Sequence, residues 1–378
     1  MVETRRVALL LGSAVAALLL AAAGVGAETS SWTSRVDPAA PIEKSQKKAP
    51  APAAKGAGFG AVQVIKAVPV APEGRLMPAV APPSGPGGQA KASAGSAAHD
   101  PAYEAFEQGY FITALELAVE AAKRGEPQAH TLVGRIYAEG LGTPPNAPLA
   151  AQWFARGAQL GDSEAMFALG MLLVHGRGVD KDRAEAARQL EAAAAHRHPL
   201  ANYNLALLFM QGDGKPQNPH RALMHMRYAA ESGVVTAQYD LGTMYATGTG
   251  TDPNAFEAAK WIGKAAAAGH VEAQVDYAVI LFRGHGVPPD AKRGAEYFRL
   301  AAEKGVATAQ NRLARCYTHG AGVPQDLVEA AKWNLIAKVG GVEDEALDKL
   351  LARLSRADVA KAQAAAVQWR DRISVGLE

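Results

Sequence analysis

The sequence predicts an all-α protein, a right-handed α/α superhelical solenoid of about six helix-turn-helix repeats with capping helices at its ends. Two observations predict this fold: an alanine recurs every 36 residues, and a G-x-G step follows each alanine at a constant distance. A third is the helical spacing of the apolar residues inside each unit. A strict repeat of this length is typical of stacked helical hairpins, in which each unit buries its apolar side against its neighbours.

Six full units are in register. Their first residues are Ala129, Ala165, Ala201, Ala237, Ala273 and Ala309. Taking these alanines as position 0, apolar side chains at positions 0, 4, 7 and 8 share one helical face and predict a first helix of about ten residues. A second helix is expected from position 18, closing at a glycine near position 32 that Arg197 replaces once.

Glycines at positions 11 and 13 predict a tight corner between the two helices of each unit. They are Gly140, Gly142, Gly176, Gly178, Gly212, Gly214, Gly248, Gly250, Gly284, Gly286, Gly320 and Gly322. The copy Gly248-Thr249-Gly250-Thr251-Asp252 could also be read as a phosphate-binding loop. Such a loop occurs once, after a strand, and is followed by a lysine. Six equal copies without a strand favour the structural interpretation.

The solenoid domain is predicted to span residues 99–345, with full units beginning at residues 129, 165, 201, 237, 273 and 309. Residues 101–128 resemble a shortened first unit. Residues 346–378 are expected to form capping helices, the last of which opens with the capping box Ser355-Arg356-Ala357-Asp358. Terminal units of solenoids are commonly atypical because they cover an open end.

Two segments of different composition precede the repeats. Residues 1–27 contain Arg5 and Arg6, an apolar run, and small residues before Glu28, which is the pattern of a secretory signal peptide. The run is also long enough to be an uncleaved membrane anchor. Residues 28–98, rich in Pro, Ala and Gly, are expected to form a disordered tether. Both alternatives predict export, and we expect a periplasmic location.

The repeat "AQYDLGTMYATGTGTDPNAFEAAKWIGKAAAAGHVEA", Ala237 to Ala273, resembles the Sel-one-like repeat family, helical-hairpin relatives of tetratricopeptide repeats. The resemblance covers about residues 129 to 345. It implies a scaffold, since members of the family are commonly exported bacterial or lumenal eukaryotic scaffolds, and their known work is binding other proteins. Several bacterial relatives act in envelope signalling or polysaccharide export. Some cysteine-rich relatives have been called β-lactamases, but their paired cysteines are missing here.

Composition excludes several other classes. Residues 101–378 hold 29 Lys and Arg against 31 Asp and Glu, so they lack the basic excess of a nucleic-acid binder. Cys316 is the single cysteine and is expected to be buried. The densest histidines, His196, His198, His220 and His225, lack carboxylates at ligand spacing and are interpreted as solvated or helix-terminal. We therefore expect no catalytic residue, metal site or cofactor.

A partner groove is predicted on the first helices, because positions 2, 6 and 9 line the concave face in tetratricopeptide relatives. In the central units these positions are apolar, and in the outer units they are polar or basic. The groove residues are Phe167, Met171, Tyr203, Leu207, Met210, Tyr239, Val279 and Phe282. The alternative is that this stripe packs against neighbouring helices. A groove would leave Tyr203, Leu207 and Tyr239 partly exposed.

The predicted function is a non-enzymatic scaffold or adaptor that binds a protein or peptide partner through this face. An envelope hydrolase acting on cell wall or β-lactams, and an adaptor for polysaccharide or peptidoglycan, are the alternatives. Nucleic acid is not expected as a partner. Membrane association is expected only if the N-terminal segment is uncleaved.

Overall fold

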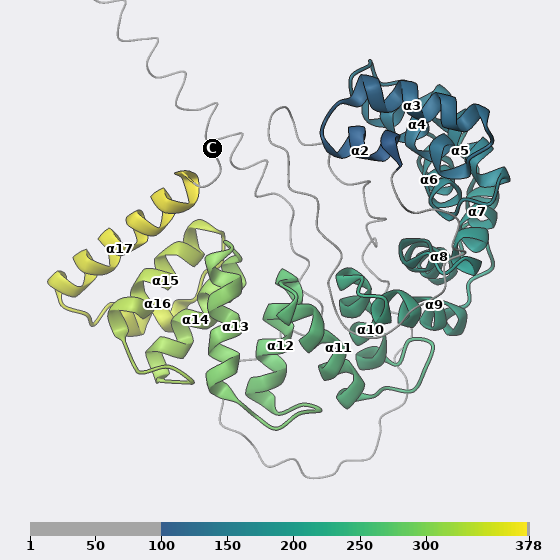
Figure 1. The fold of residues 1–378 in the computed structure, drawn as a ribbon. Helices are drawn as coiled ribbons and strands as arrows, with labels where there is room; N and C mark the ends of the chain where they lie inside the picture. The colour runs from purple at the N-terminus through teal and green to yellow at the C-terminus, as the bar shows by residue number, and fades with distance from the viewer. Residues whose placement is uncertain (1–99, 376–378) are drawn as a thin grey trace, which may run out of the picture. The chain divides into compact units, whose positions relative to one another are not determined.

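A computed structural model describes residues 100–375. Over this range the regular structure consists of sixteen α-helices, α2 to α17, and no strand (Figure 1). The helical pairs follow one another along the chain, as expected for an all-α solenoid. The predicted signal peptide, residues 1–27, and the predicted tether, residues 28–98, lie outside the described residues.

The described chain forms two compact units, one of residues 100–237 with 249–251, the other of residues 238–248 and 252–375. The N-terminal unit contains α2 (Pro101–Glu107), α3 (Phe111–Lys123), α4 (Pro127–Glu139), α5 (Ala147–Gln159), α6 (Ser163–His175), α7 (Arg183–Ala195), α8 (Pro199–Gln211) and α9 (Pro219–Glu231). Helix α10 (Val235–Thr247) begins there and continues into the C-terminal unit. The remaining helices are α11 (Ala255–Ala267), α12 (Val271–Arg283), α13 (Ala291–Glu303), α14 (Ala307–His319), α15 (Leu327–Val339), α16 (Glu345–Leu351) and α17 (Arg356–Val375).

Every helix of the six full repeats is 13 residues long. The first helices are therefore longer than the ten residues expected, because each begins two residues before the recurring alanine. The second helices begin at position 18, as predicted, from Ala147 in α5 to Leu327 in α15. Asn or Asp caps the start of each second helix with its side-chain oxygen, as Asp290 does for α13.

The two corner glycines have different tasks. Gly284 ends α12 in the left-handed conformation, with φ of 66°, which glycine adopts without steric cost. Gly286 also has positive φ, and a Cβ there would lie 2.1 Å from the Ala255 carbonyl oxygen, at the start of α11 in the preceding repeat. The second glycine is thus required by contact between repeats. This contact accounts for the G-x-G step as a structural feature, so a phosphate-binding loop is not needed to explain it.

The turn from one repeat to the next also uses positive φ. Gly161, Gly233, Gly269, Gly305 and Gly341 all adopt it. Arg197 occupies the same place with φ of 64°, the one non-glycine residue with positive φ in the described range. Arg197 therefore keeps the left-handed conformation that glycine has in the other repeats, at some cost in backbone strain.

Apolar side chains fill the space between successive helices. In the C-terminal unit one core runs from α12 to α17 and includes Phe298, Leu313 and Trp333. In the N-terminal unit Val133 and Ile136 of α4 pack with α2 and α3. Helix α3 begins 36 residues before α5, in register with the second helices, whereas the seven residues of α2 replace a full first helix.

Candidate functional site: turn pairs on the first helices

The side chain at position 2 of a first helix lies beside the residue that caps the next first helix. We call each such combination a turn pair. Three are Thr131 with Asp162, Phe167 with His198, and Tyr239 with His270. Asn311 and Asp344 form a related pair, in which Asp344 caps α16. The turn pairs join consecutive repeats on the side of the first helices, and their chemistry changes from repeat to repeat.

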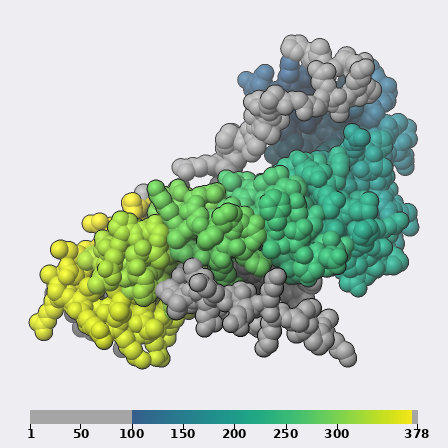
Figure 2. Space-filling model, turned by 90° about the horizontal axis from the view of Figure 1, so that it is seen from below, coloured from purple at the N-terminus to yellow at the C-terminus, as the bar shows by residue number. Residues whose placement is uncertain are grey.

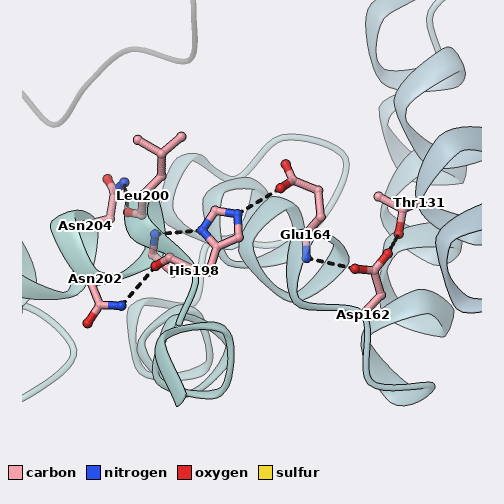
Figure 3. A network of polar contacts seen from close by, with 8 residues as sticks. Thr131, Asp162, Glu164, His198, Leu200, Asn202 and Asn204 are labelled. Carbon is pink, nitrogen blue, oxygen red and sulfur yellow. Dashed lines mark hydrogen bonds and ion pairs between the residues drawn. The ribbon is translucent and has the colours of Figure 1, made fainter. Parts of the chain in front are cut away.

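Figure 3 shows the hydrogen bonds that hold His198 in its turn pair. Its Nδ1 accepts a hydrogen bond of 3.1 Å from the Ala201 amide and so caps α8. Its Nε2 donates to Glu164 of α6 at 2.8 Å. The ring stacks on Phe167, with 4.6 Å between centroids. These contacts require a neutral imidazole with the proton on Nε2, because a protonated Nδ1 has no lone pair for the amide.

Tyr239 and His270 repeat this arrangement in the C-terminal unit. The rings stack at 4.7 Å, and His270 Nδ1 accepts from the Ala273 amide at 3.3 Å, capping α12. The Tyr239 hydroxyl donates to Asp276 Oδ2 at 2.8 Å. Glu272 lies 3.4 Å from His270 Nδ1. Two acids, an imidazole and a phenol thus share one small region of α10 and α12.

Burial perturbs these groups. Asp276 is 8% exposed, and burial raises the pKa of its carboxyl to about 6, against the lowering effect of the Tyr239 hydrogen bond. Burial lowers the pKa of His270; Glu272 opposes that shift and Lys304 adds to it. Around His198, the hydrogen bond from the imidazole lowers the pKa of Glu164. Perturbed groups of this kind are frequent at functional sites, although structural networks also produce them.

Polar side chains on the first helices of the outer repeats contact the terminal helices. Arg315 donates to Asp344 Oδ2 at 2.7 Å, and Asn311 donates to the same oxygen at 3.0 Å. Asp344 Oδ1 accepts from the Leu347 amide and caps α16. At the other end, the Arg135 guanidinium lies 4.9 Å from the centre of the Phe106 ring in α2. These positions therefore hold the terminal helices in place.

The predicted groove residues separate into two groups. Half-buried side chains are Phe167, Met171, Met210, Tyr239 and Phe282. Buried side chains are Tyr203 at 4%, Leu207 at 4% and Val279 at 3% exposure. The expectation of partial exposure is therefore wrong for Tyr203 and Leu207. The physical reason is that α8 is covered on all sides from Ala201 to Phe209.

Histidines play structural parts in this arrangement. His198 is helix-terminal, in agreement with the sequence interpretation, whereas His225 is half-buried within α9, stacks on Phe209 and contacts Asn202 Oδ1 at 2.9 Å. In the described part of the chain no group of three or more His, Cys, Asp or Glu side chains is placed to hold a metal ion. Cys316 is buried, and burial raises the pKa of its thiol to about 12.

Sequence reasoning missed Glu164, Asp276 and the capping role of His270. A signal was present for the last two. Asp276 interrupts an apolar helix, and His270 stands at the position where Asp162 caps α6. Comparing the repeats residue by residue at the turn would have identified both. Within residues 100–375, no helix has the length and apolar character needed to cross a bilayer.

Comparison with known proteins agrees with this geometry. The Sel1 repeat family model matches six consecutive segments, residues 127–162, 163–198, 199–234, 235–270, 271–306 and 307–334. A crystal structure of a Sel1 repeat protein from Oxalobacter formigenes has 28% identity and a TM-score of 0.54, covering 65% of this chain and 96% of its own.

A protective antigen of uropathogenic Escherichia coli with the same type of repeat has 25% identity and a TM-score of 0.46, covering 69% of this chain and 64% of its own. Comparison with curated proteins gives no match. Sel1 repeat proteins are helical scaffolds that typically mediate protein interactions. The six matched segments together span more than half of the chain, which belongs to the Sel1 repeat family.

Proposed function

We propose that this protein is an exported, non-enzymatic scaffold that binds a protein or peptide partner on the side of its first helices. One observation carries the proposal. The corners between helices repeat the same two glycines in all six units, whereas the turn pairs differ in chemistry: Thr131 with Asp162 and Asn311 with Asp344 are hydrogen-bonded, and Phe167 with His198 and Tyr239 with His270 are stacked. Packing accounts for the residues that are the same in every repeat. Side chains that differ between repeats, carried by helices of constant structure, are suited to recognising a partner.

The side chains on this row suit such a partner. Phe167 and Met171 in α6 are half-buried, so each keeps apolar surface that a partner side chain can cover. Glu164 lies beside them with its side chain 62% exposed, as Glu272 does beside Tyr239 at 61%. Aromatic and Met side chains bordered by charge are typical of interface centres and rims.

The binding experiment compares two methionines. A photo-crosslinking amino acid at Met171 is expected to capture a partner in living cells, and Met171→Glu is expected to weaken capture at least about tenfold by placing a charge in an apolar contact. Met224, which is 60% exposed on the second helix α9, is the matched control. Capture from position 224 but not from 171, with folding intact, would refute binding on the first helices.

Export needs its own test. We propose that residues 1–27 direct the chain to the periplasm of a Gram-negative bacterium, as a cleaved signal peptide or an anchor. An alkaline phosphatase fused to the C-terminus is then expected to be active, because that enzyme folds only in an oxidising compartment. A mature chain that starts at Glu28 would show cleavage. An inactive, stable fusion would contradict export.

A further inference from the structure

The first helical pair carries exposed apolar side chains. Tyr110 and Ile112 are each 62% exposed at the start of α3, Tyr103 is 44% exposed in α2, and Leu117 is 38% exposed. Along the exposed arc of α3, Ile112 and Leu117 stand at the edges and carboxylates stand between them. Terminal units of solenoids usually present a polar outer face for solubility. Four large apolar side chains, interspersed with carboxylates, are thus exposed where a terminal unit usually presents a polar face.

The charge of this pair is strongly negative. Residues 100–123 include a single cation, Lys123, and its contact of 2.6 Å with Glu120 leaves most of the negative charge in place. The carboxylates are Asp100, Glu104, Glu107, Glu116 and Glu120. A surface that combines bulky apolar side chains with carboxylates fits a partner with small apolar side chains and cations.

Helix α17, at the other end of the chain, has that composition. Ala357, Ala360, Ala364 and Val367 are exposed and follow a spacing of three and four residues, so they form one stripe along the helix. The opposite side of α17 is occupied, since Ala362 is fully buried and Trp369 packs 5.7 Å from Trp333. Figures 1 and 2 show α17 at the edge of the C-terminal unit.

Cations flank the stripe on both sides. Arg356 and Arg370 lie along one edge, and Lys361 and Arg372 lie along the other. The helix has four cations and the two acids Asp358 and Asp371, so it is net positive where α2 and α3 are net negative. The small side chains of the α17 stripe leave room for the bulky apolar side chains of α2 and α3. The flanking cations of α17 would then lie near the carboxylates of α2 and α3.

We propose that α2 and α3 of one molecule bind α17 of a second copy, head to tail. Such a contact joins two different surfaces of the same chain, so every molecule keeps one free end of each kind. A 20-residue helix is about 30 Å long, enough to cross the two short helices of the first pair. The proposal does not depend on which partner the first helices bind.

Sedimentation velocity on the full chain, over about a hundredfold range of concentration, tests the proposal. The average mass of the wild type is expected to rise with concentration, and Tyr110→Glu with Ile112→Glu is expected to remain monomeric. Phe256→Glu, at a residue that is also 62% exposed but lies on α11, should associate like the wild type. Circular dichroism checks that all variants keep their helical content.

Charge exchange gives the second arm. Arg370→Glu with Arg372→Glu is expected to weaken association at least about tenfold, as is Glu107→Arg with Glu116→Arg. An equimolar mixture of these two reversed proteins should associate again, because the unaltered α2 and α3 of the first protein meet the unaltered α17 of the second, and the two reversed surfaces also carry opposite charges. A wild type that is monomeric at every concentration, or reversed proteins that do not recover association on mixing, would overturn the proposal.

Discussion

Each repeat meets its neighbour in two places, at the corner between its own helices and at the turn that leads into the next repeat. The corners are uniform, because the second glycine lies against the backbone that starts the preceding second helix, as Gly286 does against Ala255. The turns vary, because a threonine, a phenylalanine, a tyrosine or an asparagine faces a capping aspartate or histidine. Corners fix the distance between repeats and leave the turns free to differ in chemistry.

The largest expected loss of stability distinguishes a glycine at a corner from a glycine at a turn. Gly286→Ala adds a Cβ 2.1 Å from a backbone oxygen at φ of 77°, so the two repeats must move apart, and we expect a loss of about 4 kcal/mol in unfolding free energy. Gly305→Ala, in a turn with φ of 89° and no atom within 4 Å of the new Cβ, should cost only about 1 kcal/mol. Equal losses in urea unfolding would show that the corner contact is not the constraint described here.

Asp344 forms the turn pair at the C-terminal end of the repeats, where the contribution of a turn to stability can be measured. Burial would raise the pKa of its carboxyl, but the hydrogen bonds from Arg315, Asn311 and the Leu347 amide lower it below its usual value. Asp344→Ala removes three hydrogen bonds, takes the carboxylate away from Arg315, and should destabilise the C-terminal unit by about 3 kcal/mol. Protease sensitivity of α16 and α17 should rise in parallel. A variant whose α16 and α17 stayed as resistant as the wild type would show that this turn pair does not fasten the end.

Replacing Asp276, which accepts a hydrogen bond from Tyr239, should stabilise the protein, whereas replacing Asp344 should destabilise it. Asp276 has a pKa raised to about 6, so it favours folding below its unfolded pKa near 3.8, and that contribution is lost as pH rises through 6. Asp276→Asn keeps an acceptor for the Tyr239 hydroxyl and removes the buried charge, so we expect it to stabilise the protein by about 2–3 kcal/mol at pH 7.5. At pH 4 the two proteins should unfold alike. Destabilisation at pH 7.5 would show that the hydrogen bond with Tyr239 outweighs the cost of burying the carboxylate.

The difference between corners and turns also explains what the sequence can predict. The repeat length, the helix starts at position 18 and the positive φ of the glycines follow from local propensity and strict periodicity, which six copies reinforce. The burial of Tyr203 and Leu207 does not, since it depends on what covers α8 as a whole. Nor does the contact between Tyr239 and Asp276, which lie 37 residues apart and meet only once two repeats stack. Chemistry that crosses from one repeat to the next is set by tertiary packing.

The smallest effect concerns the capping histidine itself. His270 must be neutral for Nδ1 to accept the Ala273 amide, and its pKa is lowered. Its contribution is therefore complete above the ordinary histidine pKa of 6.5 and is lost as pH falls through the folded value. We expect protonation to cost about 1 kcal/mol, the usual worth of an N-cap. The groups that face the ring are Glu272, Lys304 and Tyr239, with Asp276 behind the phenol.

His270→Asn isolates this contribution, because asparagine caps a helix at any pH in this range. Melting temperatures of the wild type and of His270→Asn should agree at pH 8, and the wild type should fall below the variant as pH decreases from about 7 to 5. Protonation of Asp276 stabilises the protein over part of the same interval, so the measurement belongs in the Asp276→Asn background, where that contribution is absent. If the two melting curves stayed parallel there, Nδ1 would not be the cap of α12, and the turn would be held by the ring stack on Tyr239 alone.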